Sequence, residues 1–183
     1  MQESSDGWKR LSFEKGPNLK LFNVRYDLMQ NPRNGASEKM IILEAQDSVN
    51  VVAETQEQEI LFVQQYRFGI GEETIELPGG IIDPGEAPED GARRELVEET
   101  GYTGEQWTYL GKVPSNPVFM DNYIHHAAVK GVTLTHEPQL DDGEAIELIR
   151  LPIEEVKEKL WSGFFQHPHT ISALVRYFSE KNK

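Results

Sequence analysis

Apolar and polar residues alternate along the first half of the chain, and this alternation predicts β-strands. Branched and aromatic residues interleave with polar ones in short runs, separated by turn-forming stretches such as residues 31–35. The predicted strands are residues 19–28, 40–44, 49–53, 60–66 and 74–77. Residues 1–18 are polar, and we expect them to be partly frayed rather than to form an element.

The second half of the chain mixes helical and strand patterns. Residues 90–100 have helical composition, and Gly101 stands where a C-cap glycine belongs. Further strands are predicted at residues 107–110, 123–129 and 145–151, and helices at residues 153–160 and 170–179. Strands followed by a helix, more strands and terminal helices predict an α/β or α+β fold with a mixed sheet.

Composition narrows the class of protein. The net charge is −13, and an acidic surface repels polyanions, so we expect neither nucleic acid nor a membrane as partner. There is no cysteine, which excludes disulfides, thiolate zinc sites and cysteine nucleophiles. The polar start of the sequence has no signal-peptide pattern, and no run approaches the roughly 20 apolar residues of a membrane span. We therefore expect a cytoplasmic globular protein.

The densest chemistry lies in GGIIDPGEAPEDGARRELVEETGY, residues 79–102. On a helix, Glu95, Glu98 and Glu99 stand at i, i+3 and i+4 and therefore share one face. Clustered carboxylate oxygens suit a hard cation such as Mg²⁺ or Mn²⁺. The alternative is an acidic helix face that is simply solvated, with Arg93 and Arg94 as surface ion-pair partners.

This run resembles the Nudix box, G-x5-E-x7-R-E-U-x-E-E-x-G-U, in which U is apolar. Every fixed position is filled at the right spacing, and the aromatic Tyr102 in the last apolar position is the only departure. The matching residues are Gly80, Glu86, Arg94, Glu95, Leu96, Glu98, Glu99, Gly101 and Tyr102. On this motif the chain is identified as a member of the Nudix hydrolase family.

The resemblance implies a fold, a domain division and roles for the box residues. We expect the Nudix fold, an α/β/α sandwich with a mixed sheet, in residues 46–183, and a small β-rich extension in residues 1–45. Glu95 and Glu99 are the expected principal metal ligands, with Glu98 as a supporting ligand. The remaining roles are the Gly79 carbonyl as backbone ligand, Glu86 near the metal, and Arg94 orienting the glutamates.

Motifs outside the box resemble ADP-ribose and nucleoside-diphosphate-sugar pyrophosphatases of this family. The run QYR ending at Arg67 and the run ELPGG beginning with Glu76 imply substrate-binding roles for both residues. Pro117, sixteen residues after Gly101, resembles a proline that marks the subfamily and implies a third substrate-binding residue. Arg67 could instead be a surface or interface arginine, and Pro117 could only shape a turn.

The expected catalytic residues are Glu144, Glu98 and Arg94. Glu144 is the second residue of a segment, residues 143–148, that resembles one supplying a late glutamate to the active site. Asp142 and a glutamate of the box remain open as the general base. The paired histidines His167 and His169 flank Pro168 near a helix start, where we expect capping or surface roles.

The resemblance implies Mg²⁺-dependent hydrolysis of the pyrophosphate linkage of nucleoside diphosphate sugars, of the ADP-ribose or GDP-mannose type, to a nucleotide and a sugar phosphate. Mn²⁺ is a possible substitute metal. The alternatives are a Nudix hydrolase of dinucleoside polyphosphates, NADH or coenzyme A, or a non-catalytic module that binds nucleotide sugars. We also expect a homodimer in which the N-terminal extension contributes to the substrate pocket.

Overall fold

A computed structural model describes residues 7–140, 143 and 145–180. The chain forms two compact units. The N-terminal unit comprises Met1–Gln46 and Pro114–Tyr123, and the core unit comprises Asp47–Val113 and Ile124–Lys183. Each unit is described by itself.

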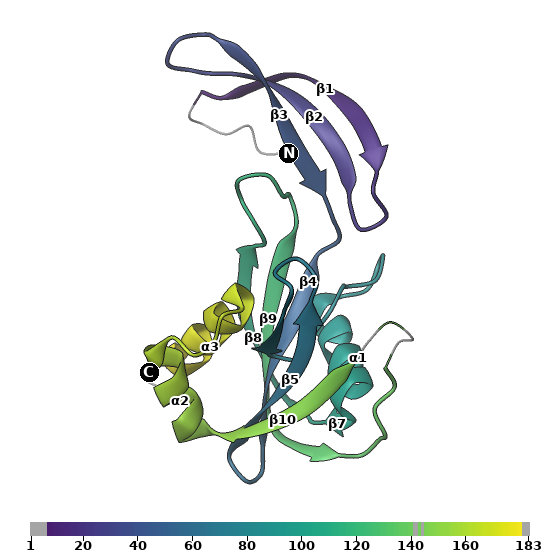
Figure 1. Ribbon diagram of the computed structural model, residues 1–183, viewed down its shortest axis with the longest axis vertical. Helices are drawn as coiled ribbons and strands as arrows, with labels where there is room; N and C mark the ends of the chain where they lie inside the picture. The colour runs from purple at the N-terminus through teal and green to yellow at the C-terminus, as the bar shows by residue number, and fades with distance from the viewer. Residues whose placement is uncertain (1–6, 141–142, 144, 181–183) are drawn as a thin grey trace. The chain divides into compact units, whose positions relative to one another are not determined.

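The N-terminal unit is built on a three-stranded antiparallel sheet. Its strands, in spatial as well as chain order, are β1 (Lys9–Asn18), β2 (Asn23–Gln30) and β3 (Ser37–Glu44), as Figure 1 shows. In the turn between β1 and β2, the Lys20 amide donates to the side chain of Asn18, and Lys20 adopts a φ of 67°. The side-chain acceptor substitutes for a backbone partner and stabilises this turn.

The sequence prediction was wrong at the start of this sheet. Lys9–Asn18 was expected to be frayed and forms β1, whereas residues 19–22, expected to begin a strand, belong to the turn. Almost every residue of β1 is exposed, so it carries little of the half-buried pattern that identifies a strand. Its conformation depends on pairing with β2 across the sheet, which local composition does not report.

A loop from the middle of the chain completes the N-terminal unit. The amide of Leu43 donates to the Phe119 carbonyl over 2.7 Å, and the Asn122 side chain donates to the Gln46 carbonyl over 2.9 Å. Arg25 on β2 forms ion pairs with carboxylates of three different segments, Asp27, Glu44 and Asp121. These contacts hold Pro114–Tyr123 against β2 and β3.

The core unit contains a mixed sheet. Its strands are β4 (Ser48–Thr55), β5 (Glu59–Arg67), β6 (Glu72–Glu76), β7 (Tyr102–Thr103), β8 (Gln106–Pro114), β9 (Tyr123–Leu134) and β10 (Ile146–Pro152). The order is β10-β5-β4-β9-β7, with β6 paired to β5 and β8 paired to β9. β4 runs parallel to β9 and antiparallel to β5, which confirms the mixed sheet expected from the sequence.

Three helices flank this sheet: α1 (Pro88–Thr100), α2 (Ile153–Ser162) and α3 (Pro168–Glu180). α1 ends where Gly101 adopts a φ of 75° and donates its amide to the Val97 carbonyl, so the predicted C-cap is confirmed. Glycine adopts this left-handed conformation without the steric cost that a side chain brings. Among the described residues, no helix has the length and apolarity that a membrane crossing requires.

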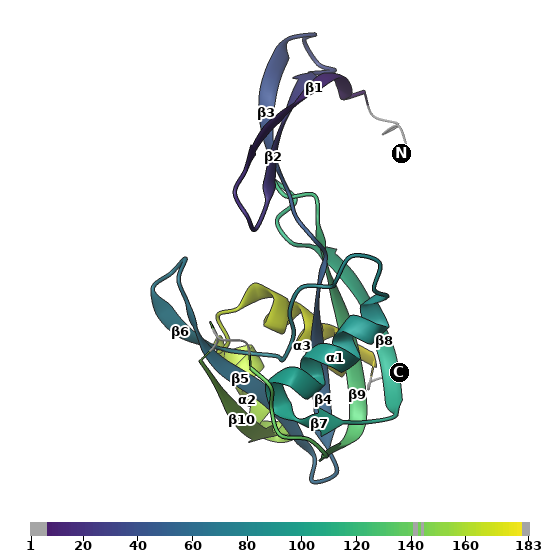
Figure 2. The same ribbon diagram turned by 90° about the vertical axis from the view of Figure 1, so that its right-hand side faces the viewer.

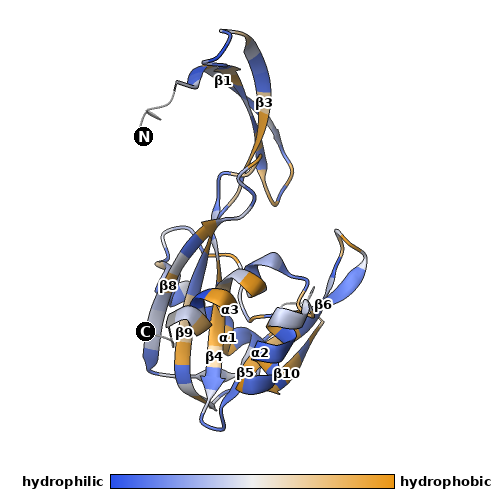
Figure 3. Cartoon of the chain, turned by 90° about the vertical axis from the view of Figure 1, so that its left-hand side faces the viewer, coloured by the Kyte–Doolittle hydropathy of each residue, from blue (hydrophilic) through white to orange (hydrophobic). Residues whose placement is uncertain are grey.

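Successive residues of β4 point to opposite faces of the sheet and so divide the core in two. Val51 and Ala53 pack with the apolar side of α1, whereas Val52 packs with α2 and α3. Figure 2 shows α1 in front of the sheet with α2 and α3 behind it, and Figure 3 shows hydrophobic residues concentrated along β4 and β9. The expected α/β/α sandwich is therefore confirmed.

A polar network is buried between the sheet and α3. His126 on β9 is fully buried, and its Nδ1 lies 2.7 Å from the Asn50 side-chain oxygen while its Nε2 lies 3.1 Å from the Ser172 hydroxyl. Burial first, and then the positive charge of Arg176, lower the pKa of His126 to about 4. The folded protein therefore keeps this imidazole neutral well below the pH at which it protonates in the unfolded chain.

We predict that His126 makes stability pH-dependent. An unfolded histidine protonates near pH 6.5 and the folded one near pH 4, so the folded state loses stability as the pH falls through this interval. Between about pH 7.5 and about pH 5 the loss from this group should be about 2 kcal/mol. Urea unfolding at both pH values should show a smaller loss for His126→Gln. Equal losses in both proteins would contradict the prediction.

Candidate active site

The loop before α1 follows the edge of β4 closely. The amides of Val51 and Val49 donate to the carbonyls of Pro78 and Gly80 over 2.8 and 2.9 Å. Gly79 lies between these two positions with a φ of 154°, and a Cβ there would stand 2.1 Å from the Val49 carbonyl oxygen. The close approach to β4 therefore requires glycine at position 79.

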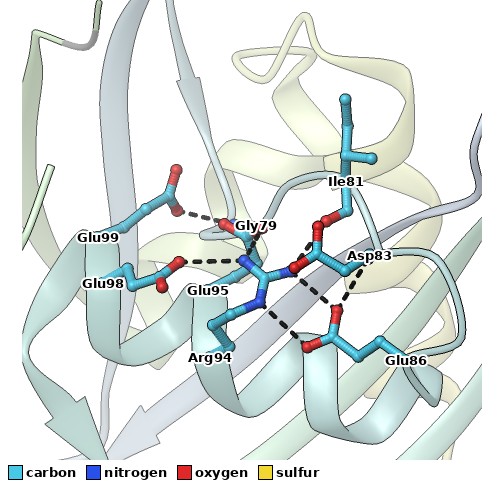
Figure 4. A network of polar contacts seen from close by, with 8 residues as sticks. All are labelled: Gly79, Ile81, Asp83, Glu86, Arg94, Glu95, Glu98 and Glu99. Carbon is cyan, nitrogen blue, oxygen red and sulfur yellow. Dashed lines mark hydrogen bonds and ion pairs between the residues drawn. The ribbon is translucent and has the colours of Figure 1, made fainter. Parts of the chain in front are cut away.

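Arg94 organises the carboxylates around this loop (Figure 4). Its Nε and Nη2 donate to the two oxygens of Glu86, each over 3.0 Å, and Nη2 also donates to the Ile81 carbonyl over 2.9 Å. Nη1 donates to Glu95 over 2.7 Å and to Glu98 over 3.0 Å. A guanidinium has five N–H groups, and these five contacts engage its whole donor capacity.

This arrangement stabilises charges of both signs. Hydrogen bonding to Glu86, followed by that to Glu95, raises the pKa of Arg94 above its ordinary value. The Arg94 hydrogen bonds, and then the amide of Asp83, lower the pKa of Glu86. Arg94 and Glu86 are therefore both ionised at neutral pH, and the guanidinium lies among the carboxylates of Glu86, Glu95 and Glu98.

Two more contacts join the glutamate-bearing face of α1 to the turn formed by Gly79 and Gly80, called the glycine turn below. The buried Glu99 accepts a hydrogen bond from the Gly79 amide over 2.8 Å. A Cβ at Gly80 would stand 2.6 Å from a Glu95 carboxylate oxygen, so this carboxylate lies directly against the turn. Glu95 and Glu99 therefore lie along the side of α1 next to Gly79 and Gly80, and Arg94 joins Glu98 to Glu95.

The residue types fit a hard divalent cation. The available donors are carboxylate oxygens, and the negative charge of the cluster exceeds the positive charge of Arg94. Within the described ranges, however, no group of three or more His, Cys, Asp or Glu side chains is arranged to hold a metal ion. The carboxylates are instead engaged by Arg94 and by the Gly79 amide. The metal roles of Gly79, Glu95, Glu98 and Glu99 stay predictions.

The two predicted substrate-binding residues of the QYR and ELPGG runs bind each other. Arg67 at the end of β5 donates from Nε and Nη2 to the two carboxylate oxygens of Glu76 on β6, both over 2.6 Å. The Glu76 side chain is only 2% exposed, whereas that of Arg67 is 43% exposed. The buried carboxylate of Glu76 therefore binds the guanidinium of Arg67, and the Arg67 side chain is partly exposed to solvent.

Sequence reasoning missed two further partners of Glu76. The Thr74 hydroxyl donates to Glu76, and Nδ1 of His167, at the start of α3, lies 3.2 Å from Glu76 Oε2. His167 was expected to be a capping or surface residue, and it directly precedes α3 with its side chain partly exposed. Its contact with a buried carboxylate was not expected. A histidine and a proline opening a helix do not by themselves predict this contact, because Glu76 lies far away along the chain.

The other predicted site residues fall elsewhere. Pro117 belongs to the N-terminal unit and is exposed in a turn, where the Asn116 carbonyl accepts hydrogen bonds from the amides of Phe119 and Met120. Its substrate role stays a prediction. Glu144 and its alternative Asp142 lie outside the described residues.

The protein belongs to a class defined by an α/β/α sandwich and by a carboxylate-bearing helix that follows a glycine turn. Comparison with known proteins identifies the family. Residues 44–173 match the model of the NUDIX domain. This match covers more than half of the chain, so the chain belongs to the Nudix family.

Relatives and a solved structure agree with this membership. The chain is 37% identical over 131 residues to the methanol dehydrogenase activator of Bacillus methanolicus, covering 69% of this chain and 71% of that protein. It is 33% identical over 123 residues to the ADP-ribose pyrophosphatase of Bacillus subtilis, covering 67% and 66%. It is 30% identical over 157 residues to the ADP-ribose pyrophosphatase of Mycobacterium tuberculosis, covering 85% and 75%.

The solved structure is a crystal structure of an ADP compounds hydrolase. It aligns with a TM-score of 0.82 and 21% identity, covering 97% of this chain and 96% of that one. At this level of identity the likeness establishes a common fold.

We predict that Gly79→Ala destabilises the protein by at least about 2 kcal/mol, because the added methyl group collides with the backbone of β4. Gly69→Ala is the matched control, since a Cβ there meets nothing within 4 Å, and its effect should stay within about 0.5 kcal/mol. Chemical denaturation of the three proteins measures both effects. Equal stability of Gly79→Ala and wild type would contradict the prediction, because it would show that the backbone of β4 can shift to make room for the methyl group.

Proposed function

We propose that this protein hydrolyses the pyrophosphate linkage of nucleoside diphosphate sugars, with ADP-ribose as the leading substrate, to a nucleotide and a sugar phosphate. The observation that carries the proposal is the cluster around Arg94, where three carboxylates surround one guanidinium beside a glycine turn. The names of the Bacillus subtilis and Mycobacterium tuberculosis relatives support ADP-ribose as the first substrate to test.

A divalent metal is required for this function, and we propose Mg²⁺, with Mn²⁺ as a substitute. Glu95, Glu99 and the Gly79 carbonyl would hold it, with Glu98 in support. When bound, the cation supplies positive charge that offsets the charge of the pyrophosphate and makes water a better nucleophile. The surplus of carboxylates favours a cation and, without one, repels an anionic substrate.

The chain's own residues orient groups and move a proton. Arg94 holds Glu95 and Glu98 in place, and because its donors are engaged by protein groups, its role is to position carboxylates rather than to bind substrate. A carboxylate accepts the proton of the attacking water, and we assign this role to Glu144, with Asp142 or Glu98 as alternatives. Arg67 and Pro117 are the proposed substrate contacts, and Glu76 contributes through Arg67.

The test is a substrate panel with and without Mg²⁺, in which phosphate release from the products is coupled to a phosphatase. ADP-ribose should be cleaved faster than NADH, diadenosine polyphosphates and coenzyme A, and activity should disappear when the metal is chelated. GDP-mannose and UDP-glucose in the same panel define the base and sugar preference. Preferred cleavage of a substrate that is not a nucleotide sugar would overturn the proposal.

Glu99→Gln is the variant that tests the metal role. Losing one anionic ligand from a site that neutralises charge should lower kcat by at least about a hundredfold. Glu89→Gln is the matched control, because Glu89 lies on the same helix, its side chain is exposed and it accepts a hydrogen bond from Arg93. The kcat of this variant should stay near wild type. A Glu99→Gln protein that keeps more than about a tenth of the activity at saturating Mg²⁺ would remove Glu99 from the ligands.

We further propose that the protein is a cytoplasmic homodimer whose N-terminal unit forms the interface and contributes to the partner's substrate pocket. The lack of cysteine suits a reducing compartment. Exposed apolar side chains on β1 and β3 support the interface, among them Leu11, Phe13 and Ile41. A closed two-fold interface buries the same patch on both subunits, so a single change acts twice.

Sedimentation of the full-length protein should therefore give a dimer. Phe13→Asp places a charge in the proposed interface and should shift the protein towards monomer and lower its activity together. Lys15→Ala, on the same strand, is the control and should stay dimeric. A full-length protein that sediments as a fully active monomer would overturn the proposed dimer without affecting the proposed chemistry.

A further inference from the structure

Glu76 is the centre of a second buried ionic cluster, outside the Nudix box. Two N–H groups of Arg67 and the hydroxyl of Thr74 donate hydrogen bonds to its two oxygens, and Nδ1 of His167 lies 3.2 Å from Oε2. A carboxylate accepts about four hydrogen bonds, so these contacts match its capacity. Burial disfavours the charged form, but Arg67, His167 and Thr74 outweigh burial and lower the pKa of Glu76. The carboxylate is therefore ionised at neutral pH.

The ionised carboxylate fixes the tautomer of His167. Burial lowers the pKa of His167 to about 4, although the charge of Glu76 opposes the shift, so the imidazole is neutral at neutral pH. A neutral imidazole has one N–H, and an ionised carboxylate can only accept. Nδ1 lies 3.2 Å from Glu76 Oε2, and a proton on Nδ1 avoids repulsion between the nitrogen lone pair and the carboxylate, which favours the Nδ1–H tautomer. The same nitrogen lies 3.2 Å from the Thr170 hydroxyl oxygen.

The start of α3 is bound to the strand that bears Glu76. The amide of Leu77, the residue after Glu76, donates to the Thr170 hydroxyl over 3.1 Å, and the amide of Ile171 donates to the His167 carbonyl over 3.2 Å. Thr170 is fully buried. The packing of the start of α3 against the end of β6 therefore determines where His167 lies relative to Glu76.

We propose that His167 is a positioning residue for Arg67: its Nδ1–H holds Glu76, and Glu76 holds the guanidinium in the orientation that contacts the nucleoside diphosphate sugar. This inference rests on the proposed function, in which Arg67 binds substrate. Glu76 takes two of the five N–H groups of Arg67 along one edge of the guanidinium. The side chain is nevertheless substantially exposed, so it meets both the buried carboxylate and the surface.

The expected effect is on substrate binding rather than on the chemical step. An arginine already held in its binding orientation loses less conformational freedom when substrate arrives. Without the His167 hydrogen bond, one acceptor position of a buried carboxylate is unsatisfied and the Arg67–Glu76 pair is held less firmly. Arg67 would contact substrate in both the ground state and the transition state, so the loss should raise KM and leave kcat nearly unchanged.

Three substitutions at one position test the geometry. The side-chain amide nitrogen of His167→Asn reaches roughly the place of Nδ1, that of His167→Gln reaches roughly the place of Nε2, and His167→Phe has no donor. KM for the preferred nucleotide sugar should rise about tenfold in the Gln and Phe variants, with kcat within about twofold of wild type. The Asn variant should keep a KM near wild type. A wild-type KM in both the Gln and Phe variants would overturn the proposal.

A spectroscopic measurement tests the same contacts without substrate. Nitrogen-15 NMR of the wild type should show His167 as the Nδ1–H tautomer at neutral pH and the Arg67 Nε–H protected from exchange with water. In His167→Phe the Arg67 Nε–H should exchange faster, while in His167→Asn it should stay protected. The opposite tautomer, or unchanged Arg67 exchange in the Phe variant, would overturn the inference.

The two experiments separate this inference from the proposed function. If the wild-type protein cleaves no nucleotide sugar, the proposed function fails, while the NMR measurement still decides whether His167 holds Arg67 through Glu76. If the wild type is active and the Gln and Phe variants match it in KM, the positioning role fails and the proposed function stands.

Discussion

The interaction on which the candidate site depends is the engagement of one guanidinium by carboxylates from a loop and a helix. Without Arg94, the negative charges of Glu86, Glu95 and Glu98 would repel one another across the loop–helix junction. Arg94 offsets part of that charge and ties both segments to the Ile81 carbonyl. The charge that remains is negative, which suits the proposed cation.

The fold holds this cluster by backbone contacts as well as by charge. The glycine turn pairs with β4 through the carbonyls of Pro78 and Gly80, and β4 itself is buried between α1 on one face and α2 with α3 on the other. The carboxylates therefore extend from a helix and a turn that are both attached to the most buried strand of the core unit. Such support restricts the movement of side chains that must act together.

Carboxylates bind Arg94 and Arg67, both in the core unit, in different ways. Arg94 uses its full donor capacity on protein groups, which suits a role in holding other residues. Arg67 gives one edge to the buried carboxylate of Glu76 and remains partly exposed, which suits contact with a ligand. In contrast to Arg67, Glu76 is buried, and Arg67, Thr74 and His167 surround its two carboxylate oxygens.

The sequence by itself determined the elements and residues whose signals are local. Gly101 ends α1 because glycine tolerates a left-handed conformation, and the spacing of the helix glutamates places them on one side because a helix turns every 3.6 residues. The order of strand and helix patterns predicted a layered fold with a mixed sheet, whereas the α/β/α sandwich was implied by the resemblance of residues 79–102 to the Nudix box. The helix end and the glutamate spacing depend on neighbours within a few residues, so the sequence pattern contains them.

Only the tertiary structure decided the features that join distant segments. β1 exists because β2 pairs with it, although its own residues are almost all exposed. The loop Pro114–Tyr123 belongs with the N-terminal strands because Arg25 and the end of β3 bind it. His167 meets Glu76 because α3 docks against the end of β6. Each contact joins residues far apart along the chain, and burial and long-range pairing leave no periodic signal in the residues themselves.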